Sequence, residues 1–287
     1  MKLSSGRPVW LLESPDAPSP YPDLDGDQEC DVVVVGAGIT GALAARELVA
    51  AGLRVLIVDR RPVGLGSTVA STALVQYEID VSLGELRRRR GEEAANAAYL
   101  GCVRAVRRLG RIASELGEDV GYAARTSLYL ASSEADVDML REEWRARRSI
   151  GIDVTWLDAA ELLARYPIRR PAAIRSAVAA QLDPWRFTST LIAAAARAGA
   201  AVRTGPGALV ERFECGNGVT LHAVGGTIRA RHAVFATGYE SQAYLDAPVA
   251  TLKSTYAIAT PALPALPGWD DRCLIWETAR PYLYLRT

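Results

Sequence analysis

The sequence predicts an α/β protein in which a domain with a parallel sheet is interrupted by an inserted α+β domain. Three observations predict this fold. A strand, a glycine-rich turn, a helix and a second strand follow one another in residues 31–59. Strands and long helices outside that rhythm fill residues 85–181, and the α/β pattern returns in residues 182–240.

The first βαβ unit has a glycine turn of specific spacing. Val32–Val35 is a β-branched apolar run too short for a helix, so it predicts a strand buried on both faces. Gly36, Gly38 and Gly41 then fit G-x-G-x-x-G. The first glycine permits a tight turn, the second lets a pyrophosphate approach the backbone, and the third lets the helix pack close to the strand. The expected helix ends at Gly52.

The second strand of this unit is expected at Arg54–Val58, and Asp59 stands at its tip. A carboxylate about 20 residues beyond the turn accepts hydrogen bonds from ribose hydroxyls and repels a 2′-phosphate. The free amides at the helix start hold a pyrophosphate. These residues therefore predict a dinucleotide site, and they leave FAD and NAD both open.

Composition excludes several other classes of protein. The 287 residues suffice for about two domains. Basic and acidic residues balance at 33 each, so no overall field favours nucleic acid. The run Arg87–Arg90 is followed directly by two glutamates and has no interleaved aromatic residues, which indicates a solvated helix face.

Four separated cysteines and two histidines offer little for a redox dithiol, a metal site or a Ser/His/Asp triad. No metal is expected. The N-terminus has no apolar signal region, and no window reaches the length of an apolar transmembrane segment. We therefore expect a cytoplasmic protein with reduced thiols and without a transmembrane segment.

The remaining elements follow in order along the chain. Residues 1–29, rich in proline, predict an extended arm in which Trp10 and Tyr21 pack on the body. Residues 60–81 predict a loop crowded with small and hydroxyl-bearing residues beside the pyrophosphate. Helices are expected at 83–90, 92–116, 133–148, 158–166 and 188–198, and strands at 126–131, 153–157, 176–182, 201–203, 209–213, 219–224, 227–230 and 233–236.

The last of these strands, Ala233–Ala236, runs into Thr237 and Gly238. A sheet strand that ends in a small residue and a glycine brings its backbone to the carboxyl edge of the sheet, where the first turn holds the pyrophosphate. Two strand ends are thus expected to converge on one ligand. The predicted domains are an arm (1–29), a dinucleotide-binding domain (30–84 and 182–240) and a second domain (85–181 and 241–287).

Together these stretches resemble the D-amino-acid oxidase and sarcosine oxidase family of FAD-dependent oxidoreductases, often described as DadA-like or glycine-oxidase-like. The resemblance rests on VVVVGAGITG with Asp59, on GSTVASTALVQYEID, on LDPWRFTSTL, on LVERFE and on the segment Thr227–Gly238 that ends in ATG. It implies a Rossmann-like FAD-binding domain and an inserted substrate domain of mainly antiparallel sheet.

The resemblance also implies the site. FAD would contact Gly36, Ala37, Gly38, Ile39, Thr40, Gly41, Asp59, Arg60, Ser67, Thr68, Ser71, Thr72, Val210, Ala236, Thr237 and Gly238, with the Val210 backbone against the adenine. Trp276, Glu277, Tyr282, Tyr284 and Arg286 match the part of the substrate domain over the flavin ring. Of these, Arg286 could hold a substrate carboxylate, and Tyr282 and Tyr284 could line the ring; a structural role in a YLYLR strand is an equal alternative.

The implied reaction is oxidation of the C–N bond of an amine or amino acid by hydride transfer to flavin N5. Two alternatives stay open, a non-catalytic FAD-binding protein and an NAD-dependent reductase. The sequence leaves the electron acceptor open, and the absence of histidine and cysteine after Asp59 argues against a covalent flavin link there. Because the alternation at Arg286–Thr287 stops in mid-strand where the family continues, we expect the chain to be a C-terminally truncated family member.

Overall fold

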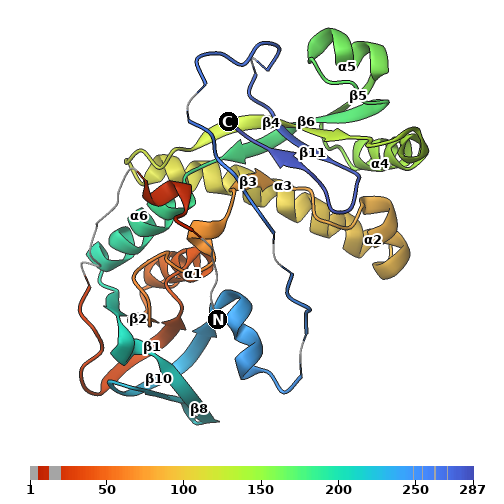
Figure 1. The fold of residues 1–287 in the computed structure, drawn as a ribbon. Coiled ribbons are helices and arrows are strands. Elements are labelled where there is room, and N and C mark those ends of the chain that lie inside the picture. Colours follow the sequence, from red (N-terminus) through yellow and green to blue (C-terminus); the bar gives the residue numbers. More distant parts are fainter. Residues whose placement is uncertain (1–5, 13–20, 248, 254, 262, 270) are drawn as a thin grey trace. The chain divides into compact units, whose positions relative to one another are not determined.

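The computed structural model describes residues 6–12, 21–247, 249–253, 255–261, 263–269 and 271–287. The chain divides into two compact units, here called unit 1 (residues 1–72 and 183–259) and unit 2 (73–182 and 260–287). Figure 1 shows the elements of both. The parts of the predicted arm at 1–5 and 13–20 lie outside the described residues. Among the described residues, no helix has both the length and the apolar character needed to cross a membrane.

Unit 1 is a mixed sheet with helices α1 and α6 packed against each other (Figure 1). Its sheet order is β7-β2-β1-β10-β9-β8, with parallel pairing from β7 to β10 and antiparallel pairing from β10 to β8. Its elements are η1 (Val9–Leu11), β1 (Gln28–Val35), α1 (Ile39–Ala50), β2 (Val55–Asp59), η2 (Thr68–Ala70), α6 (Pro184–Arg197), β7 (Ala201–Thr204), η4 (Pro206–Ala208), β8 (Val210–Gly216), β9 (Gly218–Ala223), β10 (Gly226–Phe235) and η5 (Gly238–Tyr244).

The βαβ unit forms as the sequence predicts. Residues 32–35 of β1 are buried, and they pair in parallel with both β2 and β10. Helix α1 ends one residue before the C-cap Ala51, and Gly52 takes a positive φ of 80° that ends the helix. Asp59 is the last residue of β2, at the carboxyl edge of the sheet.

Unit 2 is a sheet of mainly antiparallel strands in the order β12-β11-β4-β6-β3, with β5 paired to β6. Only the β11–β4 pair is parallel among the described strands of this sheet. Its elements are β3 (Leu74–Gln76), α2 (Leu83–Arg90), α3 (Glu92–Glu115), β4 (Ala123–Leu130), η3 (Glu134–Asp136), α4 (Val137–Ser149), β5 (Val154–Asp158), α5 (Ala159–Arg165), β6 (Ala172–Gln181), β11 (Leu274–Glu277) and β12 (Tyr284–Leu285).

The two faces of the unit 2 sheet carry separate cores, as strand alternation requires. Tyr129 and Trp276 face the helices α3 and α4, and their rings stack with centroids 3.7 Å apart. The neighbouring residues Leu128, Leu130 and Ile275 belong to the other core, which includes Leu162 of α5. The helices therefore bury both faces of this sheet.

A buried ionic network lies within the helix-side core of unit 2. The guanidinium of Arg147, whose side chain is 1% exposed, donates to Glu143 at 2.8 Å and to Glu78 at 3.2 Å. It also donates to the Tyr77 hydroxyl at 3.2 Å, and Ser127 donates to Glu78 at 3.0 Å. The sequence analysis did not predict this network. The Glu143–Arg147 spacing of four residues was its one visible signal.

Several expected elements differ from those observed. The strands expected at 126–131 and 176–182 begin earlier, at Ala123 and Ala172. Residues 227–230 and 233–236 form one strand, β10, because its parallel pairing with β1 continues through Ala230, His232 and Ala233. Arg231 and His232 are both exposed, on opposite faces of the strand, and do not interrupt it. Helix α6 begins at Pro184, since proline suits the first helical position and Asp183 accepts hydrogen bonds from two helix amides.

The boundaries between the two units also differ from those expected. The expected loop after Asp59 contains the short strand β3, which pairs with β6, so the chain first passes from unit 1 to unit 2 after residue 72 and not after residue 84. The chain passes from unit 1 back to unit 2 after residue 259 and not after residue 240.

The described part of the N-terminal arm packs on unit 1. The Asp23 carboxylate accepts hydrogen bonds from the amides of Gly207 at 3.0 Å and Ala208 at 3.2 Å. The Trp10 indole donates to the carbonyl of Ser71 at 2.8 Å, and the Tyr21 carbonyl accepts from Thr204 at 3.4 Å. Strand β1 starts at Gln28, so the arm ends at Asp27 and not at residue 29, where the sequence predicted its end.

Candidate functional site

The glycine turn after β1 meets the end of β10 at the carboxyl edge of the unit 1 sheet. Gly36 has a positive φ of 114°, and a Cβ there would overlap the carbonyl oxygen of Ala236. The Ala236 amide in turn donates to the Val35 carbonyl at 2.7 Å. A Cβ on Gly41 would overlap the Gly36 carbonyl. The glycines thus permit the close backbone approaches that bring the two strand ends together.

The start of helix α1 is built to receive an anion or a hydroxyl. Its N-cap residue, Gly38, provides no side-chain cap. The first helical amide, of Ile39, donates to the Thr68 hydroxyl at 3.1 Å, and a Cβ on Gly38 would lie 3.0 Å from that oxygen. Thr40 and Gly41 follow in the first turn, where backbone amides and the helix dipole favour negative charge.

Asp59 fixes the glycine turn. Its carboxylate accepts from the Ala37 amide at 2.8 Å and from the Arg61 amide at 2.9 Å. Burial raises the pKa of Asp59, while these backbone donors act in the opposite direction. A carboxylate has about four lone-pair positions, so it can also accept from further donors such as hydroxyls.

Residues 64–72, here called the hydroxyl loop, fold back onto the glycine turn. The Gly64 amide donates to the Ala37 carbonyl at 3.0 Å, and the Val69 amide to the Gly64 carbonyl at 3.2 Å. Thr68 is buried against α1, and the Ser67 hydroxyl lies 3.3 Å from the position of a Cβ on Gly238. The loop therefore brings Ser67 and Thr68 to the sheet edge, whereas Ser71 and Thr72 follow the 3₁₀ turn η2.

Two arginines after β2 bind the short helical segment η5, which begins at Gly238. Arg61 makes two hydrogen bonds to Glu240, at 2.8 and 2.9 Å, and Arg60 pairs with the same carboxylate. The hydrogen bond from Arg61 lowers the pKa of Glu240. Sequence reasoning named Arg60 alone. Opposite charges directly after two converging strand ends were the signal that could have identified Arg61 and Glu240.

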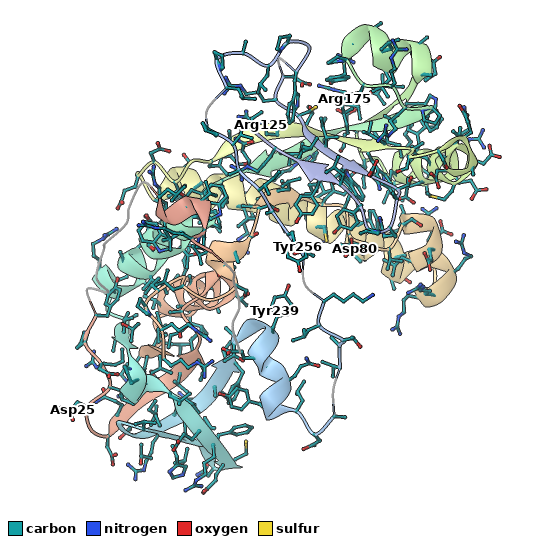
Figure 2. All side chains as sticks on the ribbon, viewed as in Figure 1. Asp25, Asp80, Arg125, Arg175, Tyr239 and Tyr256 are labelled. Carbon is teal, nitrogen blue, oxygen red and sulfur yellow. The ribbon has the colours of Figure 1, made fainter. Side chains whose placement is uncertain are left out.

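Val210 lies at the start of β8, with its carbonyl accepting from the Tyr244 hydroxyl of η5 at 3.2 Å. Tyr244 packs in an aromatic cluster with Phe213 and Phe235. Tyr239 of the same segment projects into solvent and is 59% exposed (Figure 2). The segment η5 thus connects Arg60 and Arg61 to the backbone of Val210.

Replacing Glu240 with glutamine is expected to lower the free energy of unfolding by about 1–2 kcal/mol at pH 7, because the charge-assisted bonds to both arginines weaken. Since the folded pKa is lowered, this contribution is present above the usual value of 4.5 and is lost as the pH falls through the folded pKa. Urea unfolding at pH 7 and at pH 4 measures both effects. Glu214→Gln, at an exposed hairpin ion pair, is the control. Equal stability of E240Q and E214Q at pH 7 would contradict the prediction.

The predicted substrate-side residues lie in unit 2, and the alternation of residues 282–286 divides them. A pocket of about 590 Å³ is lined by Trp276, Glu277, Leu283 and Leu285 among others. Tyr282 and Tyr284 alternate with the two leucines, their rings are 5.7 Å apart, and Tyr284 packs on the helix-side core.

Arg286 donates to the carbonyls of Ala73 at 3.0 Å and Leu182 at 2.9 Å. These two residues begin and end the first segment of unit 2, and Ala73 has a positive φ of 52°. Arg286 therefore links the two ends of this segment through hydrogen bonds to both. The role of Tyr282, Tyr284 and Arg286 in substrate binding stays a prediction.

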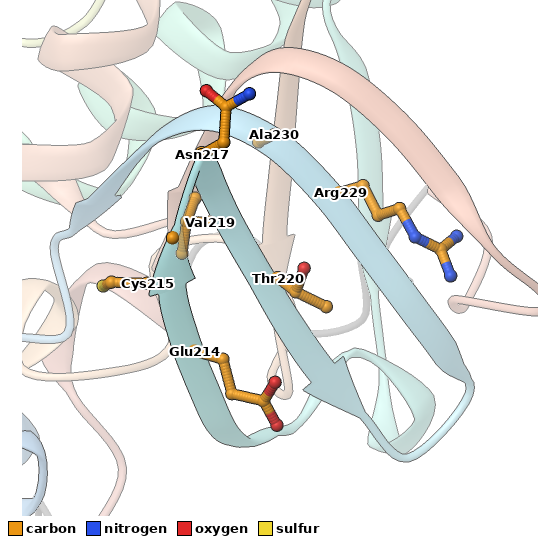
Figure 3. A pocket seen from close by; sticks show the side chains of 9 residues that line it. Glu214, Cys215, Asn217, Val219, Thr220, Arg229 and Ala230 are labelled. Carbon is orange, nitrogen blue, oxygen red and sulfur yellow. The ribbon is translucent and has the colours of Figure 1, made fainter.

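A smaller hollow of about 260 Å³ opens at the β8–β9 hairpin in unit 1, beside Glu214, Cys215 and Arg229 (Figure 3). Ala230, which also lines it, precedes Ala236 by six residues of extended chain, or roughly 20 Å. This hollow is separate from the converging strand ends.

Comparisons with known proteins indicate the family to which the chain belongs. The family model described as FAD dependent oxidoreductase matches residues 31–287. Glycine oxidase of Geobacillus kaustophilus (strain HTA426) is 26% identical over 215 residues, which cover 72% of this chain and 54% of that protein. The putative Rieske 2Fe-2S iron-sulfur protein YhfW of Bacillus subtilis (strain 168) is 30% identical over 145 residues, which cover 50% of this chain and 28% of that protein.

Solved structures show the same fold. L-proline dehydrogenase from P. horikoshii superposes with a TM-score of 0.69 at 17% identity, covering 91% of this chain and 67% of that one. For the structure of Geobacillus kaustophilus glycine oxidase the TM-score is 0.61 at 24% identity, covering 75% and 57%. The chain thus spans about half the length of glycine oxidase, and less of the Rieske protein. Because the family model matches most of its length, the chain belongs to the FAD-dependent oxidoreductase family.

Proposed function

We propose that the chain binds FAD along the carboxyl edge of the unit 1 sheet and acts in the oxidation of the C–N bond of an amine or amino acid. One observation carries the FAD site. The turn at Gly36 and the strand end at Ala236 touch so closely that a Cβ on Gly36 would overlap the Ala236 carbonyl. An extended dinucleotide needs such a paired edge, with one strand end at each side of its pyrophosphate.

The residues at this edge fit the cofactor. Gly38 has no Cβ to stand between the start of α1 and a phosphate, and the Thr68 hydroxyl, which accepts from the Ile39 amide, lies at the same place. Asp59 keeps acceptor positions for ribose hydroxyls while it fixes the turn. Ser67 and Gly238 bound the other side. The remaining proposed contacts are Ala37, Thr40, Gly41, Arg60, Ser71, Thr72, Val210, Ala236 and Thr237.

When bound, FAD supplies a hydride acceptor for the α-carbon of the amine. The protein residues bind and orient the cofactor: the α1 start holds the pyrophosphate, Asp59 the ribose, and the hydroxyl loop covers the phosphates. We assign the substrate side to unit 2, with Tyr282, Tyr284 and Arg286 as candidates.

Two observations support an amine or amino acid as substrate, the family match and the names of the relatives glycine oxidase and L-proline dehydrogenase. The electron acceptor stays open in this proposal. We further propose a cytoplasmic location, which agrees with the free thiols of Cys30, Cys102, Cys215 and Cys273.

A titration of the purified protein with FAD tests the proposal. We expect saturable quenching of flavin fluorescence and a visible flavin spectrum that stays with the protein through gel filtration. Anaerobic addition of glycine, L-proline or other amino acids is then expected to bleach that spectrum. Binding without bleaching by any amine would support the non-catalytic alternative. A protein that takes up NADH and no FAD would overturn the proposal.

A further inference from the structure

A segment outside the family match contacts the candidate FAD site from its outer side. The family model begins at residue 31, whereas residues 6–12, here called the strap, precede it. The strap is folded as the 3₁₀ turn η1, with the Leu11 amide bonded to the Pro8 carbonyl at 3.1 Å. The Arg7 guanidinium also donates to the Leu11 carbonyl, at 3.1 Å. The strap therefore has local structure of its own.

Trp10 joins the strap to the hydroxyl loop. Its indole N–H donates to the carbonyl of Ser71 at 2.8 Å across 61 positions of the sequence. Its side chain is half-buried, as is that of Leu11, while Val9 and Leu12 are 41% and 56% exposed. The turn η1 also packs on helix α6 (Figure 1). Trp10 thus reaches the loop through its indole, whereas Val9 and Leu12 are exposed.

Ser71 and Thr68 are the two ends of one short turn. The Ser71 amide donates to the Thr68 carbonyl at 3.1 Å, and the Ala70 amide to the Ser67 carbonyl at 3.2 Å. Thr68 contacts the start of α1 through the Ile39 amide. A single 3₁₀ turn has little stability alone, so its position depends on what holds its two ends. The α1 start contacts one end and Trp10 bonds to the other, while helix α6 packs on the turn.

We propose that the strap holds the hydroxyl loop in its FAD-binding conformation and that Trp10 is the positioning residue. This inference rests on the proposed FAD site. Without the indole hydrogen bond, the outer end of η2 loses an anchor, and Ser67 and Thr68 must be ordered when FAD binds. Trp10 acts through the loop backbone and needs no contact with the cofactor.

The test compares wild type with Trp10→Phe, which keeps an aromatic ring and removes the N–H donor, and with Leu12→Ala as a matched exposed control in the strap. FAD affinity is measured by ultrafiltration, and amide hydrogen exchange by mass spectrometry. We expect W10F to raise the FAD dissociation constant about two- to tenfold, the loss of one hydrogen bond. Peptides from residues 64–72 should exchange faster in W10F, and those from 32–35 should not change. L12A should match wild type in both measurements.

Three outcomes would contradict the proposal, and they distinguish a failure of the strap from a failure of the FAD site. Equal FAD affinity and equal exchange in W10F and wild type would overturn the strap proposal while leaving the FAD site intact. Faster exchange throughout unit 1 in W10F would also overturn it, because Trp10 would then be a general stability residue. If wild type itself binds no FAD, the proposed function fails, and with it the positioning role of Trp10.

Discussion

Replacing Arg147 with methionine is expected to lower the free energy of unfolding by about 3–5 kcal/mol, the usual effect of removing one partner of a buried ion pair. Methionine fills similar volume but leaves Glu78 and Glu143 without their shared cation, and both carboxyl side chains are at most 2% exposed. Urea unfolding followed by tryptophan fluorescence, which reports on Trp144 and Trp276 in the same core, measures the change.

Arg145→Met is the matched control, because Arg145 lies on the same helix, α4, and is exposed. Its effect should stay within about 0.5 kcal/mol, as for other surface substitutions. Equal stability of R147M and R145M would mean that the buried carboxyl groups of Glu78 and Glu143 do not depend on the Arg147 cation, and the prediction would be wrong.

Glu78 makes the same network sensitive to pH. Burial raises the pKa of its carboxyl, and the Arg147 charge opposes that rise. The folded protein therefore binds this proton more tightly than the unfolded chain, so the stability that Glu78 contributes is full below the usual value of 4.5 and declines as the pH rises toward the folded pKa. Glu78→Gln keeps an acceptor for Ser127 and should show a flatter stability profile across this window.

The sequence allowed the βαβ unit and its partner strand end to be predicted because each part has a local signal. A short β-branched run, three glycines at fixed spacing and a terminal carboxylate are visible without knowledge of the fold. The sequence also allowed the convergence of Gly36 with Ala236 to be predicted, since parallel strands place their carboxyl ends at one edge of the sheet. Here local pattern and global fold agree.

Elements defined by long-range pairing were predicted less well. The strand β3 has three residues, too few for a periodic pattern, and it exists because β6 pairs with it. In the sequence, the polar pair Arg231 and His232 suggests a break, but β10 is continuous there because its pairing with β1 runs through Ala230, His232 and Ala233. Tyr244 has no such sequence signal, because its role depends on the contact of its hydroxyl with the Val210 carbonyl.

Replacing Gly41 with alanine is expected to lower the free energy of unfolding of unit 1 by about 1–3 kcal/mol or more and to abolish FAD binding. A Cβ at this position would overlap the carbonyl oxygen of Gly36, so α1 must move away from the turn that it follows. Alanine otherwise favours a helix, by up to about 1 kcal/mol, so a loss of stability can come only from this clash. Thermal unfolding and FAD titration measure the two effects.

Two further glycine-to-alanine variants distinguish the effect of this clash from the general effect of an added methyl group. Gly216→Ala adds one where no heavy atom lies within 4 Å, and it should leave both measurements unchanged. Gly38→Ala puts its Cβ 3.0 Å from the Thr68 hydroxyl, a side chain that can shift, so the protein should fold while its FAD affinity falls. If G38A bound FAD as wild type does, the pyrophosphate could not lie against this turn. A G41A protein with wild-type stability and affinity would mean that α1 does not depend on close packing at Gly36, and the geometry argued for the whole edge would be wrong.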